Sequence, residues 1–216
     1  SILYGLCTLA NNFEELMFVA YLCLLGIFYL IGNSNFFNGQ KLRNNSFLIL
    51  GSLGTIGILL SLSFSWYWDE LLNNEFIFNN INDFIEIIAV IILFSTAIVL
   101  LMKQFKKEHL KQTTFIEFVF LIFTISFLIG LKSSLPIILM NLVVFTIGIL
   151  TIRKGEQKNH IGILNYGLII ITALVICRFF DTDLSFVLRG LLFISVGAGF
   201  FITNYWMLKK RNRNEK

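Results

Sequence analysis

The stretch IIAVIILFSTAIVLLMKQFKKEHLKQTTFIEFVFLIFTISFLIG, residues 87–130, decides the fold class. An apolar run that ends at Met102 is followed by a short segment with four lysines, and a second apolar run begins at Phe115. Neither run alternates polar with apolar residues, which argues against the strands of a membrane barrel. Backbone groups inside a bilayer must be hydrogen-bonded within their own segment, so such a run is a helix. The stretch therefore predicts two membrane-spanning helices joined by a basic loop.

The same pattern continues along the chain and predicts an all-α, polytopic membrane bundle. Each apolar run is close to the ~20 residues that cross a ~30 Å hydrocarbon core at 1.5 Å per residue. The seven predicted spans are residues 15–31, 47–66, 85–102, 115–131, 136–152, 161–180 and 184–208. They make one transmembrane domain over residues 15–208, and a basic tail follows at residues 209–216.

Composition agrees with a membrane protein and argues against a soluble domain. Hydrophobic residues make up 56% of the 216 residues, charged residues 14%, and the mean hydropathy is +0.80. A soluble domain carries about 25% charged residues, and a soluble chain of this length could not hide so much apolar surface. The net charge of +4 comes from short loops and the tail. We therefore expect the lipid bilayer, and no nucleic acid, as the principal partner.

The distribution of basic residues predicts the orientation in the membrane. Fourteen of the 17 Lys and Arg residues lie in four alternate polar segments. These residues are Lys41, Arg43, Lys103, Lys106, Lys107, Lys111, Arg153, Lys154, Lys158, Lys209, Lys210, Arg211, Arg213 and Lys216. Basic loops stay in the cytoplasm, so we expect a cytoplasmic C-terminus. The abundance of Ile, Asn, Lys and Phe is typical of an AT-rich bacterial genome and places the protein in the bacterial inner membrane.

Two segments outside the spans carry further expectations. Ser1 is not an initiator Met, and the apolar segment at residues 1–14 is too short to span, so it is expected to be the stump of an eighth helix. The alternative is a processed N-terminus on the outer surface. In the second segment, WYWDELLNNEFIFNNINDF, Trp66, Tyr67 and Trp68 suit the interfacial belt. The rest reads as an amphipathic helix on the outer leaflet, with a lid over a cavity as the alternative.

Ionisable residues near the ends of the spans are the candidate functional residues. The main group is Arg178, Asp181, Asp183 and Arg189 in CRFFDTDLSFVLRG, joined by Glu86 at a similar predicted depth. An Arg at that depth needs a carboxylate, a water-filled pocket or room to reach the interface. The structural interpretation is an ion-pair clamp between Arg189 and one of the three acids. The functional interpretation is a site for an anion or a lipid headgroup, lined by Arg178 and Arg189.

A second candidate is Glu117, near the inner end of the fourth predicted span. Lys111 or another basic residue of the preceding loop is its expected partner. A proton relay would need a second acid deeper in the membrane, and the sequence shows none. Glu14 and Glu15 are expected to be solvated at the mouth of the first span.

Polar and small residues inside the spans predict helix packing. Asn141, Asn165 and Asn204 are expected to hydrogen-bond between helices. The glycine-rich segments 51–57 and 190–199 are expected to let helices approach closely. His109 and His160 have no partners at ligand spacing, and Cys7, Cys23 and Cys177 read as small buried hydrophobes. The sequence thus predicts no metal and no cofactor.

The C-terminal hairpin, residues 176–213, resembles a bacterial family of predicted multi-pass membrane proteins of unknown function. The similar elements are the Arg-aromatic-aromatic-Asp turn from Arg178, the Arg189-Gly190 pair, the glycines at 197–199, Asn204 and the basic tail. The resemblance implies a multi-pass helical fold and, in many members, a small cytoplasmic domain before the helices. It implies no activity.

The sequence contains no HExxH, GxSxG or P-loop motif. The leading hypothesis is therefore a non-enzymatic membrane subunit or scaffold that binds a protein partner or a phospholipid. The alternative is a small-solute or lipid transporter with an outer-leaflet cavity lined by Arg178, Arg189 and Glu86. An intramembrane enzyme would need a nucleophile or an acid pair that the sequence does not offer.

Overall fold

The fold is all-α, as predicted. A computed structural model describes residues 14–34, 37, 44–73, 81–107, 114–179 and 185–214. The helices in these ranges are α2 (Glu14–Gly32), α3 (Ser46–Ser61), α4 (Trp66–Asn73), α5 (Ile81–Lys107), the 3₁₀ helix η3 (Phe115–Phe118), α6 (Val119–Gly130), α7 (Pro136–Gln157), α8 (Ile161–Phe179) and α9 (Phe186–Asn214). The chain divides into two compact units, residues 1–139 and 140–216. The predicted N-terminal segment lies outside the described residues, apart from Glu14.

Within the described residues, four helices are long and apolar enough to cross a membrane: α2, α5, α7 and α8. They coincide with four of the predicted spans to within a few residues, except that α5 extends further at both ends. The bent pair α3–α4 would make a fifth span. Most of the predicted seventh span lies in α9, and that helix runs through residues 209–214 of the predicted tail.

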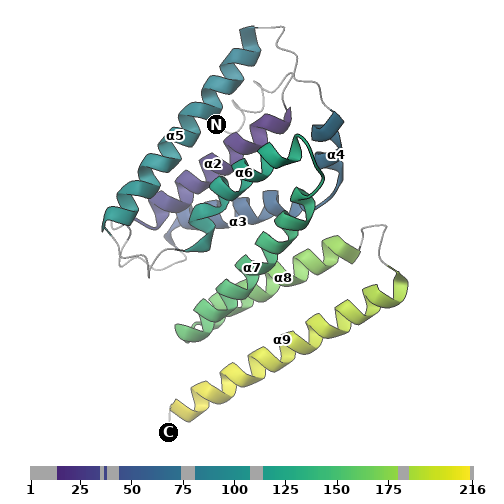
Figure 1. The fold of residues 1–216 in the computed structure, drawn as a ribbon. Helices are drawn as coiled ribbons and strands as arrows, with labels where there is room; N and C mark the ends of the chain where they lie inside the picture. The colour runs from purple at the N-terminus through teal and green to yellow at the C-terminus, as the bar shows by residue number, and fades with distance from the viewer. Residues whose placement is uncertain are drawn as a thin grey trace. The chain divides into compact units, whose positions relative to one another are not determined.

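Helix α2 is the centre of the first unit, where it lies among α3, α5, α6 and η3 (Figure 1). Its side chains are apolar almost all round, which is the pattern of a helix buried on every side. Met17, Leu24 and Tyr29 are among the many that are buried. Contact with α6 is close, because a Cβ added at Gly26 would lie 3.2 Å from the ring of Phe120.

The α2–α3 pair confirms the predicted role of the first glycine-rich segment. A Cβ added at Gly51 would lie 2.6 Å from the backbone nitrogen of Tyr29, and one at Gly54 would lie 2.5 Å from the side chain of Leu25. Such separations are below any real contact, so the two helices approach with only hydrogen atoms between them. Gly57 has nothing within 4 Å among the residues described.

The second predicted span, residues 47–66, is wrong as a single helix. Helix α3 ends at Ser61 and α4 begins at Trp66, turned by 70°. The break is held by side chains: the indole Nε1 of Trp68 donates to the carbonyl of Leu62 at 2.8 Å, and the hydroxyl of Ser63 donates to that of Leu60 at 2.6 Å. The Trp68 bond satisfies a carbonyl that the bend leaves open, and the Ser63 hydroxyl adds to the backbone bond that Leu60 already accepts.

Two of the three aromatic residues that were assigned to the interfacial belt are buried within the first unit instead. Trp66 is 50% exposed, whereas Tyr67 and Trp68 are fully buried. Tyr67 packs edge to face on Phe18 at 4.9 Å, and Trp68 packs on Phe123 at 6.1 Å. One face of α4 therefore packs on the core of the unit, while the other face, with Asp69, Glu70 and Leu72, is exposed.

The fourth predicted span, residues 115–131, matches the apolar segment Phe115–Gly130 to within one residue, but that segment is not one regular α-helix. It begins as the 3₁₀ helix η3, and the regular helix α6 ends at Gly130. The whole apolar segment, Phe115–Gly130, is too short to count among the membrane-length helices. Its inner face carries Phe120, Phe123 and Phe127, while Ile125 and Leu128 are exposed.

In the second unit α7 and α8 form a tight antiparallel hairpin. A Cβ at Gly148 would lie 2.6 Å from the side chain of Ile171, and one at Gly167 would lie 2.7 Å from the backbone nitrogen of Ile152. This register places Asn141 and Arg178 at the same level, each seven residues beyond the Gly148–Ile171 contact.

Helix α9 runs alongside α8 (Figure 1). Its glycines do not act as predicted within the described residues: a Cβ added at Gly190, Gly197 or Gly199 would meet nothing within 4 Å. The amide of Asn204 donates to the carbonyl of Phe200 at 3.1 Å, within the same helix rather than between helices.

Candidate functional site

The structure distributes the predicted Arg and acid cluster over both units. Arg178 is half-buried in the last turn of α8. Asp181 and Asp183 lie outside the described residues, and Arg189 lies in α9 with its side chain outside them. Glu86 belongs to α5 in the first unit. Each unit is described by itself, so the predicted ion-pair clamp and the predicted cavity remain predictions.

Glu86 is fully buried on the inward stripe of α5. Val90, Ala97 and Leu101 follow it at helical spacing and are also buried. Leu93, near the same stripe, packs against the Met17–Leu24 cluster of α2. A carboxyl group on this stripe is therefore enclosed between α5 and its neighbours rather than open to bulk water.

Glu117 is also fully buried and forms a hydrogen-bonded junction between three segments. Its Oε1 accepts from the side-chain amide of Asn33 at 2.9 Å and from the backbone N–H of Thr114 at 3.2 Å. The amide of Gln104 donates to the same oxygen at 3.5 Å. These donors come from the residue just after α2, the last turn of α5 and the start of η3.

The three hydrogen bonds indicate a structural role for this junction. All three donors are N–H groups, which hold a carboxylate as an acceptor. The expected partner Lys111 lies outside the described residues. Asn33 and Gln104 were not predicted, but Thr114 and Glu117 form a capping box, and the pattern Thr-x-x-Glu is visible in the sequence.

Replacement of Glu117 by Ala should destabilise the protein by about 2–4 kcal/mol, because three donors would lose their acceptor in a buried place. Glu117→Gln keeps an acceptor oxygen and should cost about half as much. Thermal unfolding of the detergent-solubilised chain measures both. Equal stability of the wild type and Glu117→Ala would contradict the structural role.

Glu15 was expected to be solvated, and this is wrong: it is only 5% exposed at the start of α2. The cause is α4, whose Tyr67 hydroxyl donates to the backbone carbonyl of Glu15 at 2.8 Å. This contact could not be predicted from the sequence, because it depends on the bend between α3 and α4.

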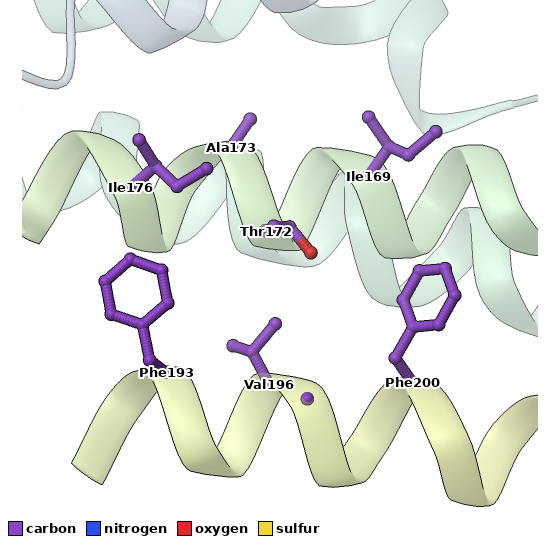
Figure 2. Close-up of a pocket in the computed structure, with 8 residues that line it drawn as sticks. Ile169, Thr172, Ala173, Ile176, Phe193, Val196 and Phe200 are labelled. Atoms are coloured by element: carbon purple, nitrogen blue, oxygen red, sulfur yellow. The ribbon is translucent and has the colours of Figure 1, made fainter. Parts of the chain in front are cut away.

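A groove with a volume of about 390 Å³ opens between α8 and α9 in the second unit. In Figure 2, Phe193, Val196 and Phe200 point from α9 toward α8, across from Ile169, Thr172 and Ile176. The lining is apolar, since the Thr172 hydroxyl donates to the carbonyl of Leu168 within its own helix.

Aromatic side chains close the groove at its two ends. The rings of Phe179 and Phe193 pack edge to face at 4.9 Å near Arg178. Phe200 packs on Leu164 and Leu168 at the opposite end. Ile169 and Phe193 remain 57% and 40% exposed, so protein atoms leave the space between the two ends open.

The described residues contain no cluster of three or more His, Cys, Asp or Glu side chains that could hold a metal ion. His160 instead caps α8, because its Nδ1 accepts from the backbone N–H of Ile163 at 3.3 Å. Comparisons with protein-family models, with curated proteins and with solved structures found no match to this chain. No residue role is therefore transferred from another protein.

Proposed function

We propose that the protein is a non-enzymatic membrane subunit that binds a protein partner through α9. The contrast between α2 and α9 supports this proposal. Helix α2 is enclosed, and hydrogen bonds at its two ends connect it to α4 and η3. Such a unit is suited to serve as a scaffold. The described residues of α9 contact α8 along one face and leave another face open.

The open face of α9 is one continuous apolar stripe. Val187, Leu191, Ile194, Phe201 and Tyr205 recur at helical spacing, and each is at least 60% exposed. This stripe differs from the face that lines the groove. Within a membrane such a face meets lipid or another helix, and large aromatic side chains are enriched where proteins bind one another.

Site-specific photo-crosslinking tests this proposal. A benzoylphenylalanine at Phe201, which is 80% exposed, should give one discrete protein adduct in native membranes. The matched control is Ile125 on α6, whose side chain is 60% exposed. A benzoylphenylalanine there should give lipid adducts only. Lipid adducts alone at both positions would reject the proposal. An adduct of twice the chain mass would identify the partner as a second copy.

We further propose that this chain has seven spans in a bacterial inner membrane, with the C-terminus in the cytoplasm. The charge pattern supports the orientation, since 14 of the 17 Lys and Arg residues fall in four alternate polar segments. Membership of the uncharacterised family is proposed on the resemblance of the C-terminal hairpin. The membrane-length helices α2, α5, α7 and α8 support the multi-pass topology.

Thiol labelling in intact cells checks the orientation. In a chain with Cys7, Cys23 and Cys177 replaced by Ser, a cysteine at Gln112 should resist an impermeant thiol reagent, because it would face the cytoplasm. A cysteine at Ser134, in the exposed turn before α7, should be labelled. The reverse result would invert the topology.

A further inference from the structure

We propose that the partner of α9 is a single membrane-spanning helix that runs beside it and carries acidic residues next to the basic tail. This inference rests on the proposed function and adds the chemistry of the partner that the open face of α9 binds. Three features of α9 carry it: the spacing of its exposed apolar residues, the length over which they extend, and the charges that follow them.

The exposed apolar residues of α9 have the alternating spacing of a coiled-coil seam. They follow one another at steps of four and three residues in turn, and all of them are exposed. These residues, which we call the seam, are Val187, Leu191, Ile194, Ala198, Phe201 and Tyr205. A mean step of about 3.5 residues keeps one stripe turned toward one neighbouring helix along its whole length. The small side chain of Ala198, in the middle of the seam, lets the backbone of that neighbour come close.

The seam is long enough to follow a partner through the bilayer. Val187 and Tyr205 are 18 residues apart in α9, which is about 27 Å at 1.5 Å per residue. The hydrocarbon core of a membrane is ~30 Å thick. A segment lying on the membrane surface would meet only one end of the seam, so the expected partner is a helix that spans the membrane.

Basic residues continue the same helix beyond the seam. Lys209, Lys210, Arg211 and Arg213 lie in the last two turns of α9, and the sequence of this helix contains no Asp or Glu. In the seven-residue repeat of the seam, Lys209 and Arg211 occupy the two flanking positions, whereas Lys210 and Arg213 occupy positions away from the seam. Charges at flanking positions determine which helices pair. We therefore expect acidic residues of the partner beside Lys209 and Arg211.

The same charges disfavour a second copy of the chain as the partner. Two copies in one membrane share an orientation, so their α9 helices would run parallel and bring their basic ends together. The axes of packed helices are about 8–10 Å apart, which is close to the screening length of about 8 Å at physiological salt. Repulsion between the two basic ends would therefore persist, whereas an acidic partner would be attracted.

Anionic lipid headgroups are the other source of negative charge near the tail. Headgroups surround a helix where it leaves the bilayer, so they would meet all four basic residues alike. A partner helix on the seam would instead meet Lys209 and Arg211 in preference to Lys210 and Arg213. The two pairs therefore give matched variants that distinguish a helix from a lipid surface.

The experiment combines the crosslink at Phe201 with charge reversal in the full chain in its native membranes. One variant carries Lys209→Glu and Arg211→Glu, and its control carries Lys210→Glu and Arg213→Glu. Both variants change the charge of the tail equally, so any effect on membrane insertion is matched. We expect the first variant to lose about nine tenths of the protein adduct and the control to retain most of it. The crosslinked peptide should belong to a spanning helix with Asp or Glu at the same end.

Three results would overturn this assignment and leave the proposed function standing. Equal adduct yields in the two variants would show that the flanking charges do not select the partner. An adduct of twice the chain mass would make the partner a second copy, and a crosslinked peptide outside any spanning helix would exclude a helix pair. If Phe201 gives lipid adducts alone in the chain with its native tail, the proposed function fails and this assignment fails with it.

Discussion

Replacement of Gly51 by Ala should destabilise the protein by about 3 kcal/mol, in the upper part of the range for overpacked cores. The added Cβ would lie 2.6 Å from the backbone nitrogen of Tyr29, 2.8 Å from its Cα and 2.9 Å from the carbonyl oxygen of Leu25. All three atoms belong to the backbone of α2, so no side chain can rotate away. The helices α2 and α3 would have to separate.

Gly57→Ala is the matched control, because it lies in the same helix and its Cβ would meet nothing within 4 Å in the described part of the chain. That change should leave the stability unchanged or raise it by up to about 1 kcal/mol through helix propensity. Thermal unfolding of the detergent-solubilised chain compares the two variants. Equal stabilities would show that α2 and α3 do not touch at Gly51.

Replacement of Trp68 by Ala should have the largest effect, a loss of about 3–5 kcal/mol. The indole ring is fully buried, packs on Tyr67 and Phe123, and bonds to the carbonyl of Leu62 at the break between α3 and α4. The substitution would leave a cavity and an unsatisfied buried carbonyl. The mutant chain should unfold well below the wild-type temperature.

Two neighbouring variants separate the causes. Trp68→Phe keeps most of the packing and loses only the hydrogen bond, so it should cost about 1–2 kcal/mol. Trp66→Ala changes an adjacent ring that is 50% exposed and should cost less than about 1 kcal/mol. If Trp66→Ala and Trp68→Ala lower the stability by equally small amounts, the ring of Trp68 does not hold α4 in its position.

The helices that could be predicted are those in which one apolar run forms one straight helix. Helices α2, α5, α7 and α8 follow directly from hydropathy, because length and apolar character are local properties of the chain. Pro136 likewise marks the first residue of α7, as its missing N–H suits that position. The first glycine-rich segment correctly predicted a close helix contact, although not that α2 would be the partner.

The bend at residues 62–65 could not be predicted in this way. The sequence Leu-Ser-Phe-Ser contains neither Pro nor Gly, and the apolar run continues through it. The bend is held by contacts with residues distant in sequence, such as the Tyr67–Glu15 bond. The burial of Glu15, Tyr67 and Trp68 follows from the bend, so all three were assigned to the wrong environment.

For the candidate sites, too, local features could be predicted from the sequence and features that depend on tertiary packing could not. The Thr114–Glu117 capping box is local and could be found from spacing alone, whereas Asn33 and Gln104 reach Glu117 only through the packing of α2 and α5. The groove between α8 and α9 depends on how two helices lie side by side. No single segment of sequence contains that information.

The socket of Trp68 also has a consequence for biogenesis. A Cβ at Gly130 would lie 2.8 Å from the indole ring, so the end of α6 forms one wall of that socket. The ribosome makes α6 well after α3 and α4. At 16 residues, α3 is short for a stable span by itself. We therefore expect α3 and α4 to lack their bent arrangement when they leave the translocon. They should reach it only after α6 has entered the bilayer.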